Sequence, residues 1–353
     1  MSELKTLLAE ALDRGASDMH LVPGSKPLYR IHTVLEQIED APAVTPQQTE
    51  QYVKEMVGER RFETLLEKRD LDFSTHVPER GRFRVNAHYQ REAIAISFRA
   101  IPNDVPEISS LGLPPVVETF AEMPRGLILV TGQTGSGKST TLASIINQIN
   151  QRYPYHVITL EDPIEYTLTH NQCLIEQREL GIDVPTFASG LRHALRQDPD
   201  IILVGEMRDL ETTSAAITAA ETGHLVLSTL HTQSAAQTIE RIIDIYPGDQ
   251  QNQIRAMLSN TLQAVLSQAL FKRNDTPGMV PACEVMICTP AIQNCIRENR
   301  IHEIPNIIST SRSAGMCTLD DSIKALYLNG QITREQALAE ANRPEALSKA
   351  ICA

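Results

Sequence analysis

The order of apolar and polar residues over positions 1–100 alternates between short helix-like and strand-like patterns. Leu4, Leu8 and Leu12 recur at helical spacing with charged residues between them, so the chain begins with an amphipathic helix and not with a signal peptide. A second helix starts at Pro46, with Thr45 as its cap. Strands are expected over residues 19–22, 28–31, 34–38, 81–89 and 93–99. These elements predict a small α+β domain.

The strand expected at residues 81–89 alternates polar and apolar side chains. Arg82 and Arg84 fall on one side of it, and Phe83 and Val85 fall on the other. Because successive side chains of a strand point to opposite faces, the two arginines share a solvent-facing side. A purely structural interpretation is that they discourage the addition of a further strand.

A change of pattern follows residue 100. Residues 101–115 carry prolines at three sites and little periodicity, which is typical of a linker, and a hinge and an ordered strap fit them equally well. Apolar strands are then expected at 127–130, 155–160, 201–204 and 224–229, with helices after 138 and over 187–195 and 210–221. This alternation predicts a mainly parallel sheet with helices on both faces and ligands at the carboxyl ends of its strands. From about residue 248 onward the pattern is mostly helical, with one candidate strand at 279–287.

The first of these buried strands runs into a glycine-rich loop that matches the phosphate-binding pattern G-x-x-x-x-G-K-[ST]. Its glycines allow backbone N–H groups to surround phosphate oxygens, and the following helix adds the positive end of its dipole. Lys138 is expected to bring its charge to the β and γ phosphates, and the Ser139 hydroxyl to ligate Mg²⁺. The residues expected to bind nucleotide in this loop are Gly132, Gln133, Thr134, Gly135, Ser136, Gly137, Lys138, Ser139 and Thr140.

Acidic and imidazole side chains follow three of the other strands. Glu206 ends an apolar strand and is expected to orient or deprotonate the attacking water, and Glu161 ends another. Both carboxylates are candidate ligands of Mg²⁺ or of its water. His231 lies just beyond the strand at 224–229 and is expected to contact the γ-phosphate, whereas His224 at its start fits a functional or a structural role equally.

Composition and charge narrow the classes of function. The chain has 353 residues, enough for two or three domains, and a net charge of −12, which argues against a broad surface for nucleic acid or anionic lipid. No apolar run approaches the ~20 residues needed to span a bilayer. The six cysteines form no C-x-x-C pair, so buried free thiols in a reducing cytoplasm are expected and no zinc site is indicated.

Four segments of the chain resemble the Walker A, Asp, Walker B and His boxes of the type II/IV secretion and type IV pilus ATPases. They are residues 132–139, 158–165, 205–209 and 222–232. The resemblance extends over nearly the whole chain, from Ala16 to Thr333. In detail the chain resembles the pilus retraction ATPases, the PilT family, more than the assembly ATPases. The assembly ATPases of these systems carry an extra N-terminal domain and a four-cysteine metal module, neither of which has a counterpart here.

The resemblance implies a fold, a reaction and partners. It implies a PAS-like α+β domain over residues 1–100, a linker over 101–115, and a RecA-like ATPase domain with a helical C-terminal part over 116–353. It implies a homohexamer that uses ATP and Mg²⁺ to drive pilus retraction and twitching motility. Arg82, Arg84 and Arg99 match arginines that reach across to the nucleotide. An inner-membrane platform protein, a paralogous pilus ATPase and a cytoplasmic location at that membrane are also implied.

Two departures from the family pattern bear on these expectations. The retraction signature Ala-Ile-Arg-Asn-Leu-Ile-Arg is present at residues 291–297 with Gln293 and Cys295 in place of an arginine and a leucine. Residues 31–34 read Ile-His-Thr-Val where the family has a glycine turn. The first leaves open an accessory pilus or secretion motor without retraction of its own.

Two functions from other classes are less favoured by the residues. A DNA translocase needs a basic channel studded with aromatic side chains, and the acidic charge balance and the absence of tryptophan count against it. A nucleotide-gated regulatory module with negligible turnover has no need of Glu161, Glu206 and two histidines around the phosphates. The sequence therefore favours a motor ATPase.

Overall fold

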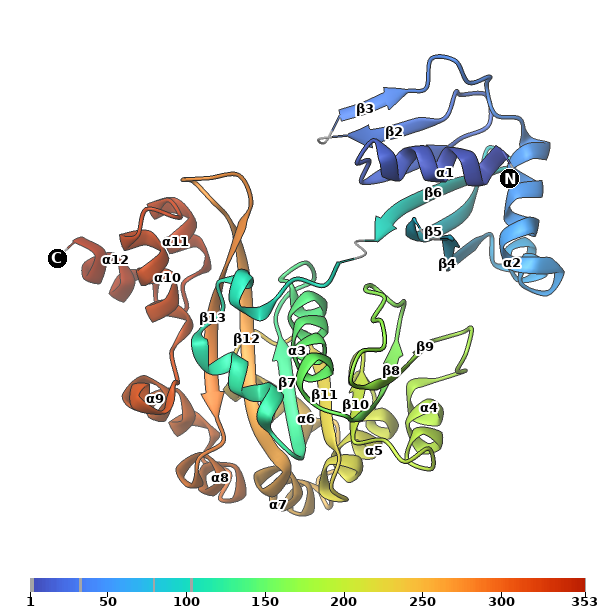
Figure 1. The fold of residues 1–353 in the computed structure, drawn as a ribbon. Coiled ribbons are helices and arrows are strands. Elements are labelled where there is room, and N and C mark those ends of the chain that lie inside the picture. Colours follow the sequence, from blue (N-terminus) through green and yellow to red (C-terminus); the bar gives the residue numbers. More distant parts are fainter. Residues whose placement is uncertain (1–2, 32–33, 79, 102–103, 353) are drawn as a thin grey trace. The chain divides into compact units, whose positions relative to one another are not determined.

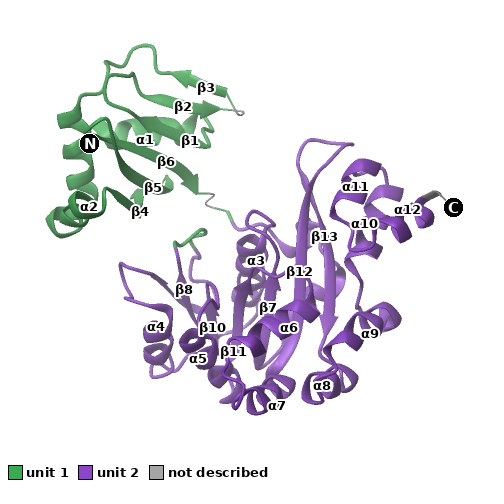
Figure 2. Cartoon of the chain, turned by 180° about the vertical axis from the view of Figure 1, so that it is seen from behind, with its two compact units in different colours: residues 1–104, 163–167 green, residues 105–162, 168–353 purple. Residues whose placement is uncertain are grey.

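The computed structural model describes residues 3–31, 34–78, 80–101 and 104–352. The chain forms two compact units, shown in different colours in Figure 2. Unit 1 comprises residues 1–104 and 163–167, and unit 2 comprises residues 105–162 and 168–353. Each unit is built on its own β-sheet.

Unit 1 is a six-stranded antiparallel sheet in the order β3-β2-β1-β6-β5-β4. Its helices are α1 (Glu3–Asp13) and α2 (Pro46–Lys68), and Thr45 caps α2 as predicted. The strands are β1 (Asp18–Leu21), β2 (Leu28–Ile31), β3 (Val34–Gln37), β4 (Asp70–Val77), β5 (Gly81–Gln90) and β6 (Ala93–Ile101). The sequence analysis missed β4, and residues 32 and 33 of the unusual turn lie outside the described residues.

The two faces of this sheet differ. Side chains such as Phe83, Val85 and Phe98 are buried in a cluster with residues of α1 and α2, so the helices cover one face. On the other face the alternate residues of β5 are polar, and Arg84 of β5 and Arg99 of β6 are exposed there. The expectation that Arg82 shares this face with Arg84 is confirmed by the alternating burial of β5.

Unit 2 is a seven-stranded sheet in the order β13-β12-β7-β11-β10-β8-β9, in which only β13 is antiparallel to its neighbour (Figure 1). The predicted α/β fold with a mainly parallel sheet is therefore confirmed. The strands are β7 (Gly126–Thr131), β8 (His156–Glu161), β9 (Leu174–Glu179), β10 (Ile201–Val204), β11 (Leu225–Leu230), β12 (Leu262–Lys272) and β13 (Met279–Ile287).

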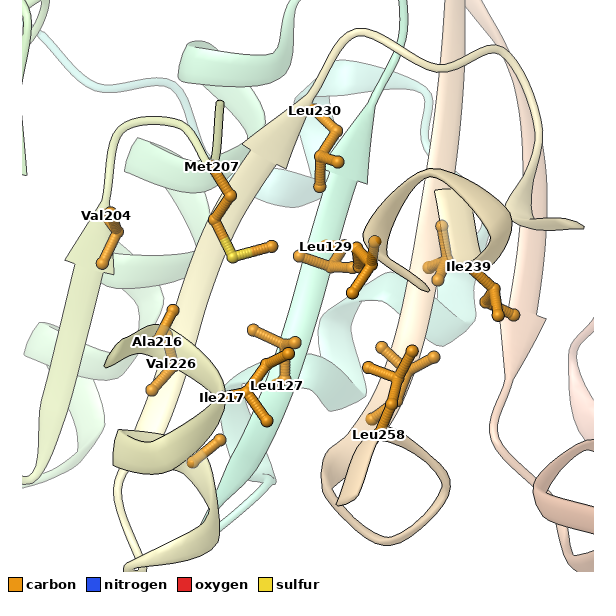
Figure 3. Packing of buried hydrophobic residues seen from close by; sticks show 14 of the residues in the cluster. Leu127, Leu129, Val204, Met207, Ala216, Ile217, Val226, Leu230, Ile239 and Leu258 are labelled. Atoms are coloured by element: carbon orange, nitrogen blue, oxygen red, sulfur yellow. The ribbon is translucent and has the colours of Figure 1, made fainter. Parts of the chain in front are cut away.

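Both faces of the central strands are covered, because their side chains alternate between two apolar clusters. Leu127 and Leu129 of β7 lie in a cluster with α4 to α9, and Ile128 and Val130 lie in one with α3, η1 and η2. Figure 3 shows Leu129 and Ile239 in the first cluster. The α-helices in these two clusters are α3 (Lys138–Arg152), α4 (Phe187–Ala194), α5 (Leu210–Glu221), α6 (Ala235–Asp244), α7 (Gln251–Thr261), α8 (Pro290–Arg297) and α9 (Ile304–Thr310). Unit 2 also contains the 3-10 helices η1 (Ile108–Leu111), η2 (Pro115–Glu122), η3 (Ile301–Glu303) and η4 (Arg312–Ala314).

The expectation of a mostly helical region from residue 248 is wrong at β12. Leu262, Val265, Leu266 and Ala269 have helical spacing, but the segment is a strand buried between β7 and β13. A continuous apolar run buried on both faces does not distinguish strand from helix by its periodicity. The rest of this region is helical and ends in α10 (Leu319–Leu328), α11 (Arg334–Glu340) and α12 (Pro344–Cys352), which share a small core with β12 and β13.

The segment expected to be a linker is ordered over most of its length. Ile108 is buried in unit 2, and Ser144 of α3 donates a hydrogen bond to the carbonyl oxygen of Pro106. Residues 102 and 103 lie outside the described residues. From Pro106 onward the segment is a strap on unit 2.

Candidate active site

The glycine-rich loop joins the buried strand β7 to the helix α3. A Cβ atom on Gly132 would lie 2.3 Å from the carbonyl oxygen of Gln268, so no larger residue fits this approach. Gly135 and Gly137 have φ angles of 82° and 89°, in the left-handed region that favours glycine. The loop therefore has the tight backbone path that a phosphate-binding loop needs.

Two side chains of the loop, those of Lys138 and Ser136, have buried polar groups. The ammonium of Lys138, which is buried, donates hydrogen bonds to the carbonyl oxygens of Gly132 at 2.8 Å and Gln133 at 2.9 Å. The Ser136 hydroxyl is buried as well, and no hydrogen-bond partner accompanies it within the part of the chain that the structure describes. A buried polar atom without a partner is costly, and a phosphate oxygen would satisfy it. The cradle thus fits a nucleotide phosphate.

The acidic and imidazole residues expected at the site come from three other strands of the same sheet. In the parallel part of the sheet the order is β7, β11, β10, β8, and the chain leaves these strands at the same edge. His231 follows β11, Glu206 follows β10 and Glu161 ends β8. With strands about 4.8 Å apart, Glu206 starts about 10 Å from the loop strand and Glu161 one strand further away.

The Glu206 carboxylate lies between an imidazole and a guanidinium. Its carboxylate accepts a hydrogen bond from Nε2 of His231 at 3.2 Å and forms an ion pair with Nε of Arg208 at 2.5 Å. The Glu206 side chain is only 13% exposed, whereas those of His231 and Arg208 are 47% and 70% exposed. The sequence predicted that Glu206 and His231 lie at this edge, but it indicated no role for Arg208.

Glu161 is anchored on its own side of the edge. Its Oε1 accepts hydrogen bonds from the Thr159 hydroxyl at 2.6 Å and from the Gln177 amide at 3.0 Å. Gln177 comes from β9, which the sequence analysis missed. The contact with Gln177 holds the Glu161 carboxylate toward β9, on the side of β8 away from β10.

The arginines of unit 1 meet on the polar face of its sheet. Arg84 and Arg99 are directly opposite each other on β5 and β6, an arrangement that is unfavourable for like charges. Asp18 relieves part of this repulsion by accepting a hydrogen bond from Nε of Arg99 at 2.9 Å. Arg82 donates to the Ser74 hydroxyl at 2.6 Å. The polar face of this sheet thus carries several arginines together with the carboxylates of Asp18, Asp70 and Asp72.

A family model described as "Type II/IV secretion system protein" matches residues 1–318. The chain belongs to this family. It is 45% identical to the "Type IV pilus retractation ATPase PilT" of Pseudomonas aeruginosa, over 97% of this chain and 99% of that protein. It is 44% identical to a "Twitching motility protein" of Neisseria gonorrhoeae, over 91% of this chain and 86% of that protein.

A solved structure of a family member agrees with the fold. The crystal structure of the pilus retraction motor PilT with bound ADP superposes with a TM-score of 0.91 at 44% sequence identity, covering 99% of this chain and 100% of that one. The resemblance to PilT drawn from the four boxes is confirmed. No helix in the described part of the chain has the length and apolar character to cross a membrane.

The structure adds a cavity that the sequence analysis missed. It has a volume of about 120 Å³ and lies beside Gly132–Ser136 of the loop. Gln268 lines it, and its buried side-chain oxygen, like the Ser136 hydroxyl, lacks a hydrogen-bond partner in the described ranges. The other lining residues come from the loop after β11, from β12, from the C-terminal helices and from the connection between α11 and α12: Gln233, Ala269, Leu270, Leu319, Glu340 and Asn342. They lie far apart in sequence, so no local motif marks them.

Three other described histidines have structural contacts. His224 lies at the amino end of β11, the opposite end from the loop, and its Nδ1 donates to the carbonyl oxygen of Ala219 at 2.9 Å. His20 is hydrogen-bonded to Ser97, and His170 accepts from the amide of Ile175. Of the two histidines in the His box, only His231 lies at the carboxyl edge.

The expected magnesium ligands can be compared with the geometry. Among the described residues no three His, Cys, Asp or Glu side chains come together to hold a metal ion. Ser139 lies in the first turn of α3, directly after Lys138 of the phosphate loop. A metal held by one protein hydroxyl, nucleotide oxygens and water needs no such cluster, so the residues fit Mg²⁺ bound together with a nucleotide.

Proposed function

We propose that this chain is a motor ATPase that couples ATP hydrolysis to type IV pilus retraction and so to twitching motility. The observation that carries the proposal is the sheet edge where the phosphate loop, His231 and Glu206 come from strands β7, β11 and β10. Hydrolysis needs a phosphate cradle and a carboxylate that orients water, and this edge provides both. The similarity to PilT along the full length of the chain supports the assignment to retraction.

Each residue at the edge has a proposed task. Lys138 leaves the loop carbonyls and binds the β and γ phosphates, and the remaining loop residues from Gly132 to Thr140 surround them. Ser139 holds Mg²⁺, which would neutralise charge on the phosphate oxygens. Glu206 orients or deprotonates the attacking water, with Glu161 next to it.

His231 links the nucleotide to Glu206. Its Nε2 lies 3.2 Å from the Glu206 carboxylate, so it is placed between the loop strand and the proposed base. In this position it senses the γ-phosphate while keeping the carboxylate in one orientation. Loss of the γ-phosphate removes that contact, which couples hydrolysis to the loop after β11.

The arginines of unit 1 complete the site in our proposal. Residues 1–100 form a PAS-like domain, residues 101–115 the connection, and residues 116–353 a RecA-like ATPase domain. In a homohexameric ring, Arg82, Arg84 and Arg99 of one copy reach the nucleotide of another. Arginines in trans stabilise charge on the transferred phosphoryl group and can contribute about 10³ or more in rate. They also make hydrolysis depend on the position of the domains.

The proposed location is cytoplasmic, at the inner membrane, on a pilus platform protein and together with a paralogous pilus ATPase. Gln293 of the altered retraction signature favours a second candidate function, an accessory pilus or secretion ATPase. It is half-buried on α8, whereas Cys295 is buried, so the departure at Gln293 can change a surface contact.

The test combines a purified protein and a cell. Steady-state ATP hydrolysis, measured on fractions from a sizing column, should coincide with a ring-sized species. Disruption of the gene should abolish surface motility while leaving pili on the cell. Motility that persists, together with intact hydrolysis, would favour the accessory function, and absence of hydrolysis would contradict the motor.

A further inference from the structure

A buried carboxylate lies near the active-site edge without a role in the proposed reaction. Glu284 of β13 is 6% exposed. Its Oε1 accepts a hydrogen bond of 2.8 Å from the backbone N–H of Ala235, the first residue of α6. A negative charge at a helix N-terminus is stabilised by the free N–H groups and the helix dipole.

Glu284 belongs to a buried polar row that runs across three strands. Thr131 ends β7 immediately before the phosphate loop, Ser267 of β12 lies opposite Thr131, and Glu284 lies opposite Ser267. The hydroxyls of Thr131 and Ser267 are 2.8 Å apart. All three side chains are buried, so the row lies within the sheet directly beneath the loop.

The helix that Glu284 holds is the one that follows His231. Only residues 232–234 separate His231 from α6, and they are hydrogen-bonded to its first turns. The Thr232 hydroxyl lies 2.7 Å from that of Thr238, and the Ser234 side chain accepts from the amide of Gln237. A shift in the start of α6 therefore moves the segment that carries His231 to Glu206.

We propose that Glu284 is a positioning residue for hydrolysis, which fixes the start of α6 and through it the placement of His231 against Glu206. This inference rests on the proposed function of His231. It also explains why a carboxylate is present at this position, although burying it away from water costs free energy. Burial raises the pKa of Glu284, the Ala235 N–H lowers it, and the nearby charge of Asp320 raises it further, with a net increase.

The test is the kinetics of Glu284→Ala alone and combined with His231→Ala. The single variant should lower kcat about tenfold and leave KM for ATP within about threefold, because binding through the phosphate loop is unaffected. If Glu284 acts through His231, the double variant should be no slower than His231→Ala. An unchanged kcat, or losses that multiply in the double variant, would overturn the inference.

Two further variants keep the test informative. Glu284→Gln retains an acceptor for the Ala235 N–H and should recover most of the lost kcat. If Glu284→Ala does not fold, Ala235→Pro removes the same hydrogen bond from the donor side at a position where helices accept proline, and it should lower kcat to a similar extent. A normal kcat in Ala235→Pro would then overturn the inference.

Controls separate this inference from the proposed function. Thr45→Ala removes a side-chain acceptor at the start of α2 in unit 1, so it should leave kcat unchanged. Lys138→Ala tests the nucleotide site itself. Persistent hydrolysis in Lys138→Ala contradicts the proposed function, whereas loss of hydrolysis there with a normal Glu284→Ala contradicts the positioning role alone.

Discussion

The two sheets of this protein place their polar chemistry differently. In unit 2 both faces of the sheet are covered by apolar side chains, and the functional groups lie where the parallel strands end. In unit 1 helices cover one face only, and the arginines lie along the other. One unit therefore offers a site at an edge, and the other offers a charged surface.

This difference separates stability from activity. A change within the sheet of unit 2 disturbs two packed layers, whereas a change on the open face of unit 1 disturbs few contacts. Arg84 is exposed and lies opposite the like charge of Arg99, so we expect it to contribute little to folding. We infer that their value lies in a reaction in which another copy takes part.

The largest expected effect concerns the edge site. Lys138→Ala removes the charge expected over the phosphates and should abolish ATP turnover. The protein should still fold, because the apolar residues of α3, the helix that begins at Lys138, remain packed against the sheet of unit 2. Turnover and circular dichroism measured on one preparation check this, and near-normal hydrolysis would remove the site from this edge.

Glu206→Gln should have the next largest effect. The substitution keeps the shape of the side chain and removes the negative charge that faces His231 and Arg208. Turnover should fall by about 10² or more while nucleotide still binds. Fluorescent-nucleotide binding and steady-state rates distinguish the outcomes: lost binding with normal turnover per bound nucleotide would make Glu206 a ligand or a fold residue.

A pair of variants tests the contrast in stability. Leu129→Ala, in the covered sheet of unit 2, should lower the free energy of unfolding by about 2–5 kcal/mol. Arg84→Ala, on the open face of unit 1, should change it by less than about 0.5 kcal/mol while lowering turnover steeply. Denaturant unfolding of both variants measures the difference. A large stability loss in Arg84→Ala would make the arginines structural.

The smallest expected effect is a pH dependence in unit 1. Burial raises the pKa of Asp18, but hydrogen bonds from Arg99 and Ser17 outweigh it, and the net pKa is lowered. A lowered carboxyl pKa stabilises the folded state above the pKa of the unfolded chain, and this stabilisation is lost as pH falls through the folded value. Wild type should therefore be more stable than Asp18→Asn at neutral pH, and the difference should shrink below about pH 4. A constant difference would contradict the ion pair.

The sequence predicted the local features of the site better than its surroundings. The phosphate loop is predictable because residues 132–139 are contiguous and form a recognisable pattern of glycines followed by a lysine. Glu206 and His231 were found because each follows an apolar strand. Their contact with each other depends on the order of β10 and β11 in the sheet, which the spacing of apolar residues does not specify.

The missed features depend on pairing between distant segments. The run at 262–272 fits a helix by its spacing, and only its position next to β7 makes it a strand. Glu284 reaches Ala235 across 49 positions in the chain, and its polar row exists only once β7, β12 and β13 are aligned. No pattern along the chain indicates such contacts.

The most direct test of the whole account mixes two variant proteins, one changed in unit 1 and the other in unit 2. Arg84→Ala and Lys138→Ala are each expected to be inactive. The first lacks one of the arginines of unit 1, and the second lacks the lysine of the phosphate loop. In a mixed ring, some sites combine an intact loop with an intact arginine set from a neighbour. ATP turnover of the mixture should therefore recover in part, with exchange of labelled subunits measured in parallel. If subunits exchange and no activity returns, the arginines of unit 1 do not complete a neighbour's site.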